Sequence, residues 1–151
     1  MVSIAHATTG AFIAAVLPYP WVYIPLSLAS HFALDFVRHY DIGVAAKIYH
    51  YSKTEMIAWE AVDLLVSVLM IALIWQQTFT NYNPHLWIGA FFGILPDILE
   101  TSDYFFHQPL KILQPIYHLH DVFHHSTRQF WWGVIPQIIL VSTIALAANW
   151  S

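Results

Sequence analysis

The sequence predicts an all-α integral membrane protein, folded as one domain over residues 1–151, with about five apolar helices and one histidine-rich helix. Three observations predict this class. Hydrophobic residues make up 58% of the chain and charged residues only 9%, whereas soluble domains carry roughly 25% charged residues. The apolar residues fall into five long segments separated by polar or prolyl turns. Seven Trp and eight Tyr suit the aromatic belts at membrane surfaces.

The first three apolar segments have well-marked ends. Residues 3–17 stop at the prolyl turn 18–20. No basic stretch precedes this segment, so we expect a retained helix rather than a signal peptide. The second helix is expected over residues 21–39. The third is expected over residues 54–75, with Thr54 as its N-cap.

The last two apolar segments each contain a proline. Residues 84–106 include Pro96, which we expect to kink the helix rather than end it. Residues 131–148 include Pro136. Membrane helices tolerate such prolines because neighbouring groups satisfy the freed backbone. A span needs about 20 apolar residues, so the first and fourth segments are the two that are short for a full crossing.

The positive charges predict the orientation. With five crossings, the N-terminus, the loop 38–53 and the segment 97–129 lie on one side of the membrane. That side then carries every Lys and Arg of the chain, namely Arg38, Lys47, Lys53, Lys111 and Arg128. The positive-inside rule makes this side cytoplasmic. So few cations, at a net charge of −4, exclude a nucleic-acid partner, which would need a basic patch.

Residues 116–125 hold four histidines and one aspartate. If this stretch is helical, His120 and His124 lie one turn apart on one face. Two imidazoles at that spacing can bind one metal ion. The alternative is an exposed histidine-rich helix at the membrane surface, since a His-rich tract is only a compositional signal.

Other segments bring imidazoles and carboxylates to the same side of the predicted bundle. There is no cysteine, so a ligand set of His and Asp is expected, which suits zinc and also manganese or iron. Neighbouring carboxylates can also orient a ligating imidazole. The predicted metal ligands are His6, His31, Asp35, Asp97, His120 and His124.

Three short motifs resemble those of the bacterial membrane-bound metal-dependent hydrolases. They are Ala5-His6-Ala7-Thr8-Thr9-Gly10-Ala11, Ser30-His31-Phe32-Ala33-Leu34-Asp35 and Gly93-Ile94-Leu95-Pro96-Asp97. The His-xxx-Asp spacing is also similar to that of zinc-dependent phospholipase C. The resemblance implies a bacterial inner-membrane protein whose metal site includes His6, His31, Asp35, Asp97 and histidines of the stretch 118–125.

The leading hypothesis is therefore a membrane metal-dependent hydrolase, or an inactive relative of one. A bound divalent metal would lower the pKa of water toward neutrality, and Asp97 or Glu100 would act as general base. A lipid ester or phosphoester is the expected substrate, because the site lies at a bilayer. Two further classes stay open: a scaffold or accessory subunit with membrane-protein partners or a second copy, and an iron protein, either a His-box di-iron oxygenase or a haem protein.

Overall fold

The computed structural model describes residues 1–76, 82–106 and 111–148, and these residues are helical with no strand. The all-α prediction is confirmed. A π-helical turn at Ala72–Gln76 follows α4, and a 3₁₀ turn at Lys111–Leu113 precedes α6. The α-helices are α1 (Ser3–Val16), α2 (Pro20–Asp35), α3 (Ile42–Tyr49), α4 (Lys53–Ile71), α5 (Pro84–Phe106), α6 (Gln114–Phe123) and α7 (Phe130–Ala148).

The five apolar helices and the histidine-rich helix lie close to where the sequence predicted them, and α5 continues through Pro96 as expected. The structure differs from the prediction at the N-cap of α4, in an additional helix α3 and at the end of α2. The N-cap of α4 is Ser52 rather than Thr54, because Ser52 and Glu55 form a reciprocal capping box. Helix α3 was not predicted. It is only eight residues long, and the Asp41 side chain caps it by accepting a 2.7 Å bond from the Val44 N–H.

Helix α2 ends at Asp35, four residues before its predicted end. The following residues instead run beside the segment that follows α6. The His125 N–H donates to the Asp35 carbonyl at 3.0 Å, and the Thr127 N–H donates to the His39 carbonyl at 2.8 Å. This pairing of distant backbone segments places His39 next to His124.

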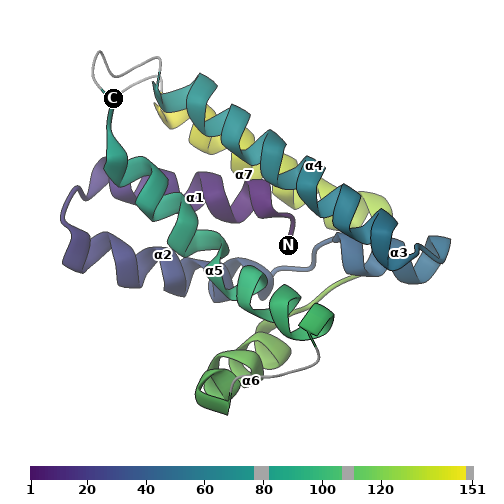
Figure 1. Ribbon diagram of the computed structural model, residues 1–151. Coiled ribbons are helices and arrows are strands. Elements are labelled where there is room, and N and C mark those ends of the chain that lie inside the picture. Colours follow the sequence, from purple (N-terminus) through teal and green to yellow (C-terminus); the bar gives the residue numbers. More distant parts are fainter. Residues whose placement is uncertain (77–81, 107–110, 149–151) are drawn as a thin grey trace.

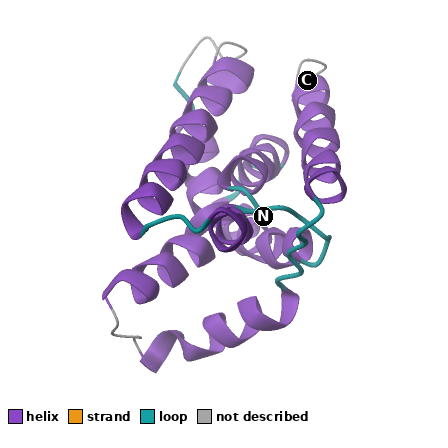
Figure 2. Ribbon diagram, turned by 90° about the vertical axis from the view of Figure 1, so that its right-hand side faces the viewer, coloured by secondary structure: helices purple, strands orange, loops and turns teal. Residues whose placement is uncertain are grey.

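Helix α1 is the centre of the molecule. It packs against α2, α4, α5 and α7, and its start lies among the other helices (Figures 1 and 2). Glycines allow the closest of these approaches: a Cβ on Gly10 would overlap the Gly89 carbonyl, and one on Gly93 would overlap the His6 carbonyl. Small residues let helix backbones touch in this way.

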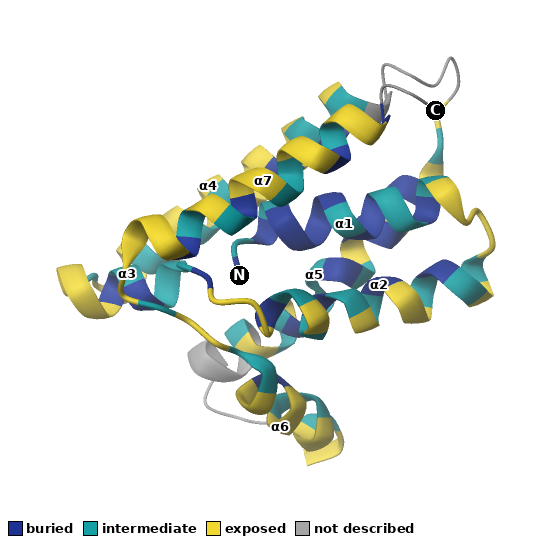
Figure 3. Ribbon diagram, turned by 180° about the vertical axis from the view of Figure 1, so that it is seen from behind, coloured by how far each residue is buried: buried dark blue, intermediate teal, exposed yellow. Residues whose placement is uncertain are grey.

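Two segments of the described chain are candidate membrane spans, so the predicted bundle of five spans is not confirmed. They are Lys53–Ile74, which includes α4, and Phe130–Ala148, which is α7. Only 11% and 17% of their apolar windows are buried, so most of their side chains face outward (Figure 3). Helix α1 has 14 residues, about 21 Å at 1.5 Å per residue, against a hydrocarbon thickness of about 30 Å. It is a central packing helix.

Candidate metal centre

Helices α2, α5 and α6 bring imidazoles and carboxylates together beside the start of α1. Within the described residues, His31, Asp35, Asp97 and His120 each offer one ligand atom, and these atoms lie within 4.8 Å of one another. We call these four residues the primary cluster. The two α2 residues are one turn apart, and α5 and α6 supply the other two.

The distances in the primary cluster fit a tetrahedral metal ion. The Asp35 Oδ2 atom lies 3.2 Å from His31 Nε2 and 3.3 Å from His120 Nε2. The Asp97 Oδ1 atom lies 3.5 Å and 3.4 Å from the same two nitrogens. Ligands at about 2.0–2.1 Å from a tetrahedral ion are separated from each other by about 3.3–3.4 Å. The four residues therefore surround a space of the right size for one ion.

Three of these atoms are buried without a hydrogen-bond partner: His31 Nε2, Asp35 Oδ2 and His120 Nε2. A buried polar atom left unpaired costs about 1–3 kcal/mol, and three of them facing one point indicate that something absent from a bare polypeptide binds there. A cation satisfies the carboxylate and the two nitrogen lone pairs together.

The outer nitrogens of both imidazoles are held by oxygen acceptors. The His31 Nδ1–H donates to the Gly93 carbonyl at 2.9 Å, and the His120 Nδ1–H donates to Glu100 Oε2 at 2.8 Å. Metal-ligating histidines carry such partners, which fix the ring and direct the Nε2 lone pair at the ion. Glu100 thus lies behind a predicted ligand.

The electrostatics of the primary cluster favour positive charge. Burial by itself would lower the pKa of His120, but the close carboxylates of Asp35, Asp97 and Glu100 raise it to about 11. Three carboxylates around one imidazole stabilise a cation at this point. A divalent ion would meet the same field.

His6 lies next to the primary cluster and faces the other oxygen of each aspartate, Asp35 Oδ1 and Asp97 Oδ2. Its Nε2 atom is 3.2 Å from Asp35 Oδ1 and 3.9 Å from Asp97 Oδ2, and its ring stacks on His31 at a centroid distance of 4.0 Å. Both ring nitrogens are buried without a hydrogen-bond partner. The α-amino group of Met1 also contacts Asp35 Oδ1.

A second cluster shares Asp35 with the first and adds His39 and His124. The Nε2 atoms of these two histidines face each other at 3.0 Å, and Asp41 Oδ2 lies 3.4 Å and 3.3 Å from them. The His39 Nδ1–H donates to the Val37 carbonyl at 2.8 Å. With that tautomer, the inward Nε2 carries a lone pair, which can accept a hydrogen bond from His124 Nε2–H or bind a cation.

Asp41 is charged in this second cluster. Burial would raise the pKa of Asp41, but the nearby imidazoles of His124 and His39 and the hydrogen bond from the Val44 N–H hold it well below its usual range. Its Oδ2 atom is buried without a hydrogen-bond partner. Asp35, with one oxygen toward each cluster, is positioned to bridge two ions.

The structure therefore brings five of the six predicted ligands to the primary cluster or against it. His124 instead faces His39 and Asp41 in the second cluster, although its ring stacks on His120 at 4.8 Å. Sequence reasoning did not select His39 or Asp41. His39 carried a signal, since it stands four residues after Asp35, whereas Asp41 lies in a connection without periodicity.

Both clusters adjoin one polar cavity of about 560 Å³. Its walls include Asp41, Asp97, Glu100, His120 and His124, together with Glu60 and Asp63 of α4. The cavity is large enough for a small-molecule head group. An ion in the primary cluster would thus have access to substrate and water.

Comparison with known protein families, with curated proteins and with solved structures found no match to this chain. The class of the protein therefore rests on its fold and its centre: an all-helical protein with two candidate membrane spans and two adjoining His/Asp clusters that could hold metal ions. The resemblance to the membrane-bound metal-dependent hydrolases stays a prediction.

Replacing Glu100 with glutamine is expected to weaken metal binding by roughly 10–100-fold, the usual cost of losing a carboxylate behind a ligating histidine. Glutamine keeps the shape but removes the charge at His120 Nδ1. Zinc titration of the purified, metal-stripped variant by calorimetry measures the change. Glu55→Gln removes an exposed carboxylate that belongs to neither cluster, at a capping-box position that also accepts glutamine, and it should leave the affinity unchanged. Equal affinities in all three proteins would remove Glu100 from the centre.

Proposed function

We propose that this protein is a membrane-embedded, metal-dependent hydrolase that binds zinc in the primary cluster. The observation that carries the proposal is the set of buried, unpaired ligand atoms at tetrahedral spacing on the wall of a polar cavity. Ligands from two histidines and two aspartates suit zinc, with manganese and iron as the other candidates.

The chemistry follows from what the side chains can hold. Zinc, when bound, supplies Lewis acidity and an activated water. Glu100 is half exposed on the cavity wall, so one carboxylate oxygen can orient His120 while the other accepts a proton from water. Asp97, bound through Oδ1, has a second oxygen near His6 that can share this role. His39, His124 and Asp41 offer a second cation position across Asp35, which suits hydrolysis assisted by two ions.

The two candidate spans support a membrane location. Lys53 begins α4 and Arg128 lies two residues before α7, so the positive-inside rule places both starts on the cytoplasmic side. Because α4 and α7 run in the same direction (Figure 1), the chain must return between them, and α5 is the helix that does so. The polar cavity is lined by Met56 and Glu60 of α4 and by Ser126, close to these starts, which supports a centre at the cytoplasmic leaflet.

A hydrolysis assay tests the proposal. Bis(p-nitrophenyl) phosphate and p-nitrophenyl butyrate, presented in detergent micelles, cover the phosphoester and acyl ester classes. We expect zinc-dependent turnover of one of them, lost with chelator, restored by zinc, and reduced by roughly 100-fold or more in Asp97→Asn, as for removal of a group essential to the transition state. Glu55→Gln should retain full activity.

A structural role is the competing function, favoured by the outward apolar side chains of α4 and α7. Those surfaces suit contact with other membrane proteins or a second copy of the chain as well as with lipid. A folded, zinc-loaded protein that hydrolyses neither substrate and copurifies with a membrane partner would favour the scaffold. Bound iron with oxygen-dependent turnover would favour the oxygenase.

A further inference from the structure

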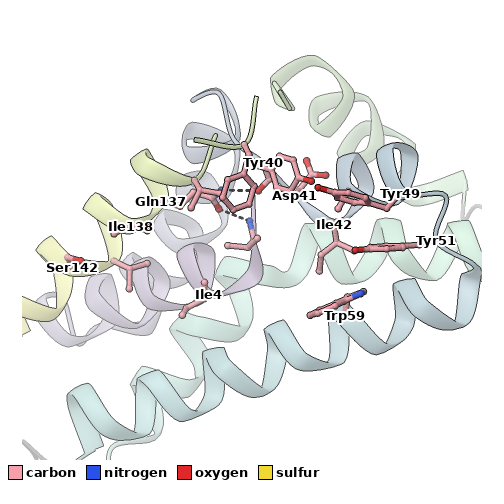
Figure 4. A pocket seen from close by; sticks show the side chains of 15 residues that line it. Ile4, Tyr40, Asp41, Ile42, Tyr49, Tyr51, Trp59, Gln137, Ile138 and Ser142 are labelled. Atoms are coloured by element: carbon pink, nitrogen blue, oxygen red, sulfur yellow. Dashed lines mark hydrogen bonds between the residues drawn. The ribbon is translucent and has the colours of Figure 1, made fainter. Parts of the chain in front are cut away.

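An open apolar cavity of about 520 Å³ lies beside the second cluster, between α3, α4 and α7 and over the start of α1. Figure 4 shows Tyr49, Tyr51 and Trp59 in a column along one side and Gln137, Ile138 and Ser142 on the α7 side. The Tyr49 and Tyr51 rings stack at a centroid distance of 5.8 Å, and Tyr51 and Trp59 at 6.5 Å. Three stacked rings form one wall.

Gln137 and Asp41 also line this cavity, but their polar atoms bind other parts of the protein. The Gln137 amide donates to the carbonyls of Tyr40 and Gly133, and it accepts from the Val2 N–H. Asp41 accepts from the Val44 N–H and faces the histidines of the second cluster. The space itself therefore meets mostly hydrocarbon and ring surface, so an apolar group would bind there without losing hydrogen bonds.

The apolar cavity adjoins the polar cavity at the metal centre. Four residues line both, namely Val2, Asp41, Ile42 and Tyr51. A molecule that crosses this boundary would have one end among apolar side chains and the other at Asp97, His120 and His124. Only an amphiphile fits both halves.

We propose that the apolar cavity holds the hydrocarbon chain of a lipid whose ester or phosphoester head lies at the metal centre. The inference rests on the proposed function, and it specifies the substrate class. The source of the chain is the bilayer, because two walls of the cavity belong to the candidate spans: Trp59 on α4, and Val134, Ile138 and Val141 on α7. Apolar chains bind in such sites by burial of hydrocarbon surface.

Photolabelling tests the site separately from catalysis. The probe is a lysophosphatidylcholine with a diazirine in its acyl chain, added to the protein in detergent, followed by peptide mass spectrometry. We expect labels on α3 and on the lining residues of α7 in the wild type. Val134→Trp fills the cavity and should lower this labelling by roughly tenfold, the effect of losing about 1.4 kcal/mol of contact.

Ile139→Trp is the matched control, because it places the same side chain on α7 at an exposed position outside the cavity; its labelling should equal that of the wild type. Ala45→Phe narrows the cavity from α3 and serves if Val134→Trp does not fold. Labels spread over the outer faces of α4 and α7, unchanged by the filling variants, would overturn the inference. Specific labelling without any hydrolysis would instead reject the hydrolase and retain the lipid site.

Discussion

Replacing Asp35 with asparagine is expected to abolish stoichiometric metal binding at both clusters. Asp35 is fully buried, and its two oxygens lie near imidazoles from three helices, His6 of α1, His31 of α2 and His120 of α6, and near His39 after the end of α2. Asparagine keeps the volume but removes the central negative charge, so the loss should exceed the roughly 10–100-fold cost of a supporting residue.

Elemental analysis of the purified protein measures this effect, with helix content from circular dichroism as the check on folding. We expect about two zinc ions per chain in the wild type, none in Asp35→Asn, and about one in His39→Ala, which removes a ligand of the second cluster alone. His118→Ala changes an exposed histidine of α6 outside both clusters and should retain both ions. A wild-type protein that folds fully and binds no divalent metal would refute the metal centre.

Replacing Gly10 with alanine is expected to lower the stability of the folded protein by about 1–3 kcal/mol, the usual cost of overpacking. The new Cβ would overlap the carbonyl of Gly89 on α5, and backbone cannot rotate away as a side chain can. Because α1 and α5 also carry His6 and Asp97, forcing these helices apart should weaken zinc binding as well.

Gly43→Ala gives the matched comparison, since the same methyl group there would meet only the Asp41 side-chain oxygen, at 3.2 Å. The Asp41 side chain can move by the few tenths of an ångström needed, and alanine is favoured over glycine within helices by about 1 kcal/mol, so this variant should lose far less stability than Gly10→Ala. Thermal unfolding in detergent should show a Tm lower by roughly 5 °C for Gly10→Ala. An unchanged Tm would mean that α1 and α5 do not pack through Gly10.

The helices were largely predictable because their signals are local. Apolar runs, the prolyl turn 18–20 and the start of the fifth segment depend on neighbouring residues, and the structure places the helices within a few residues of the expected ends. The predicted end of α2 was wrong because backbone hydrogen bonds to residues near His125 compete with continuation of the helix. The predicted number of membrane spans is not confirmed, because an apolar helix such as α1 has the same sequence pattern whether lipid or protein surrounds it.

The sequence alone determined that this is a helical, cysteine-free protein with imidazoles and carboxylates concentrated in a few segments, and that His31 and Asp35 share a helix face. Tertiary structure decided the rest of the centre. It directed the Nε2 atom of His124 toward His39 and Asp41 rather than into the primary cluster, and it set Glu100 behind His120. The physical reason is that ligand geometry depends on contacts between distant residues, such as His39 and His124, which are 85 positions apart in the chain, and no local pattern encodes such contacts.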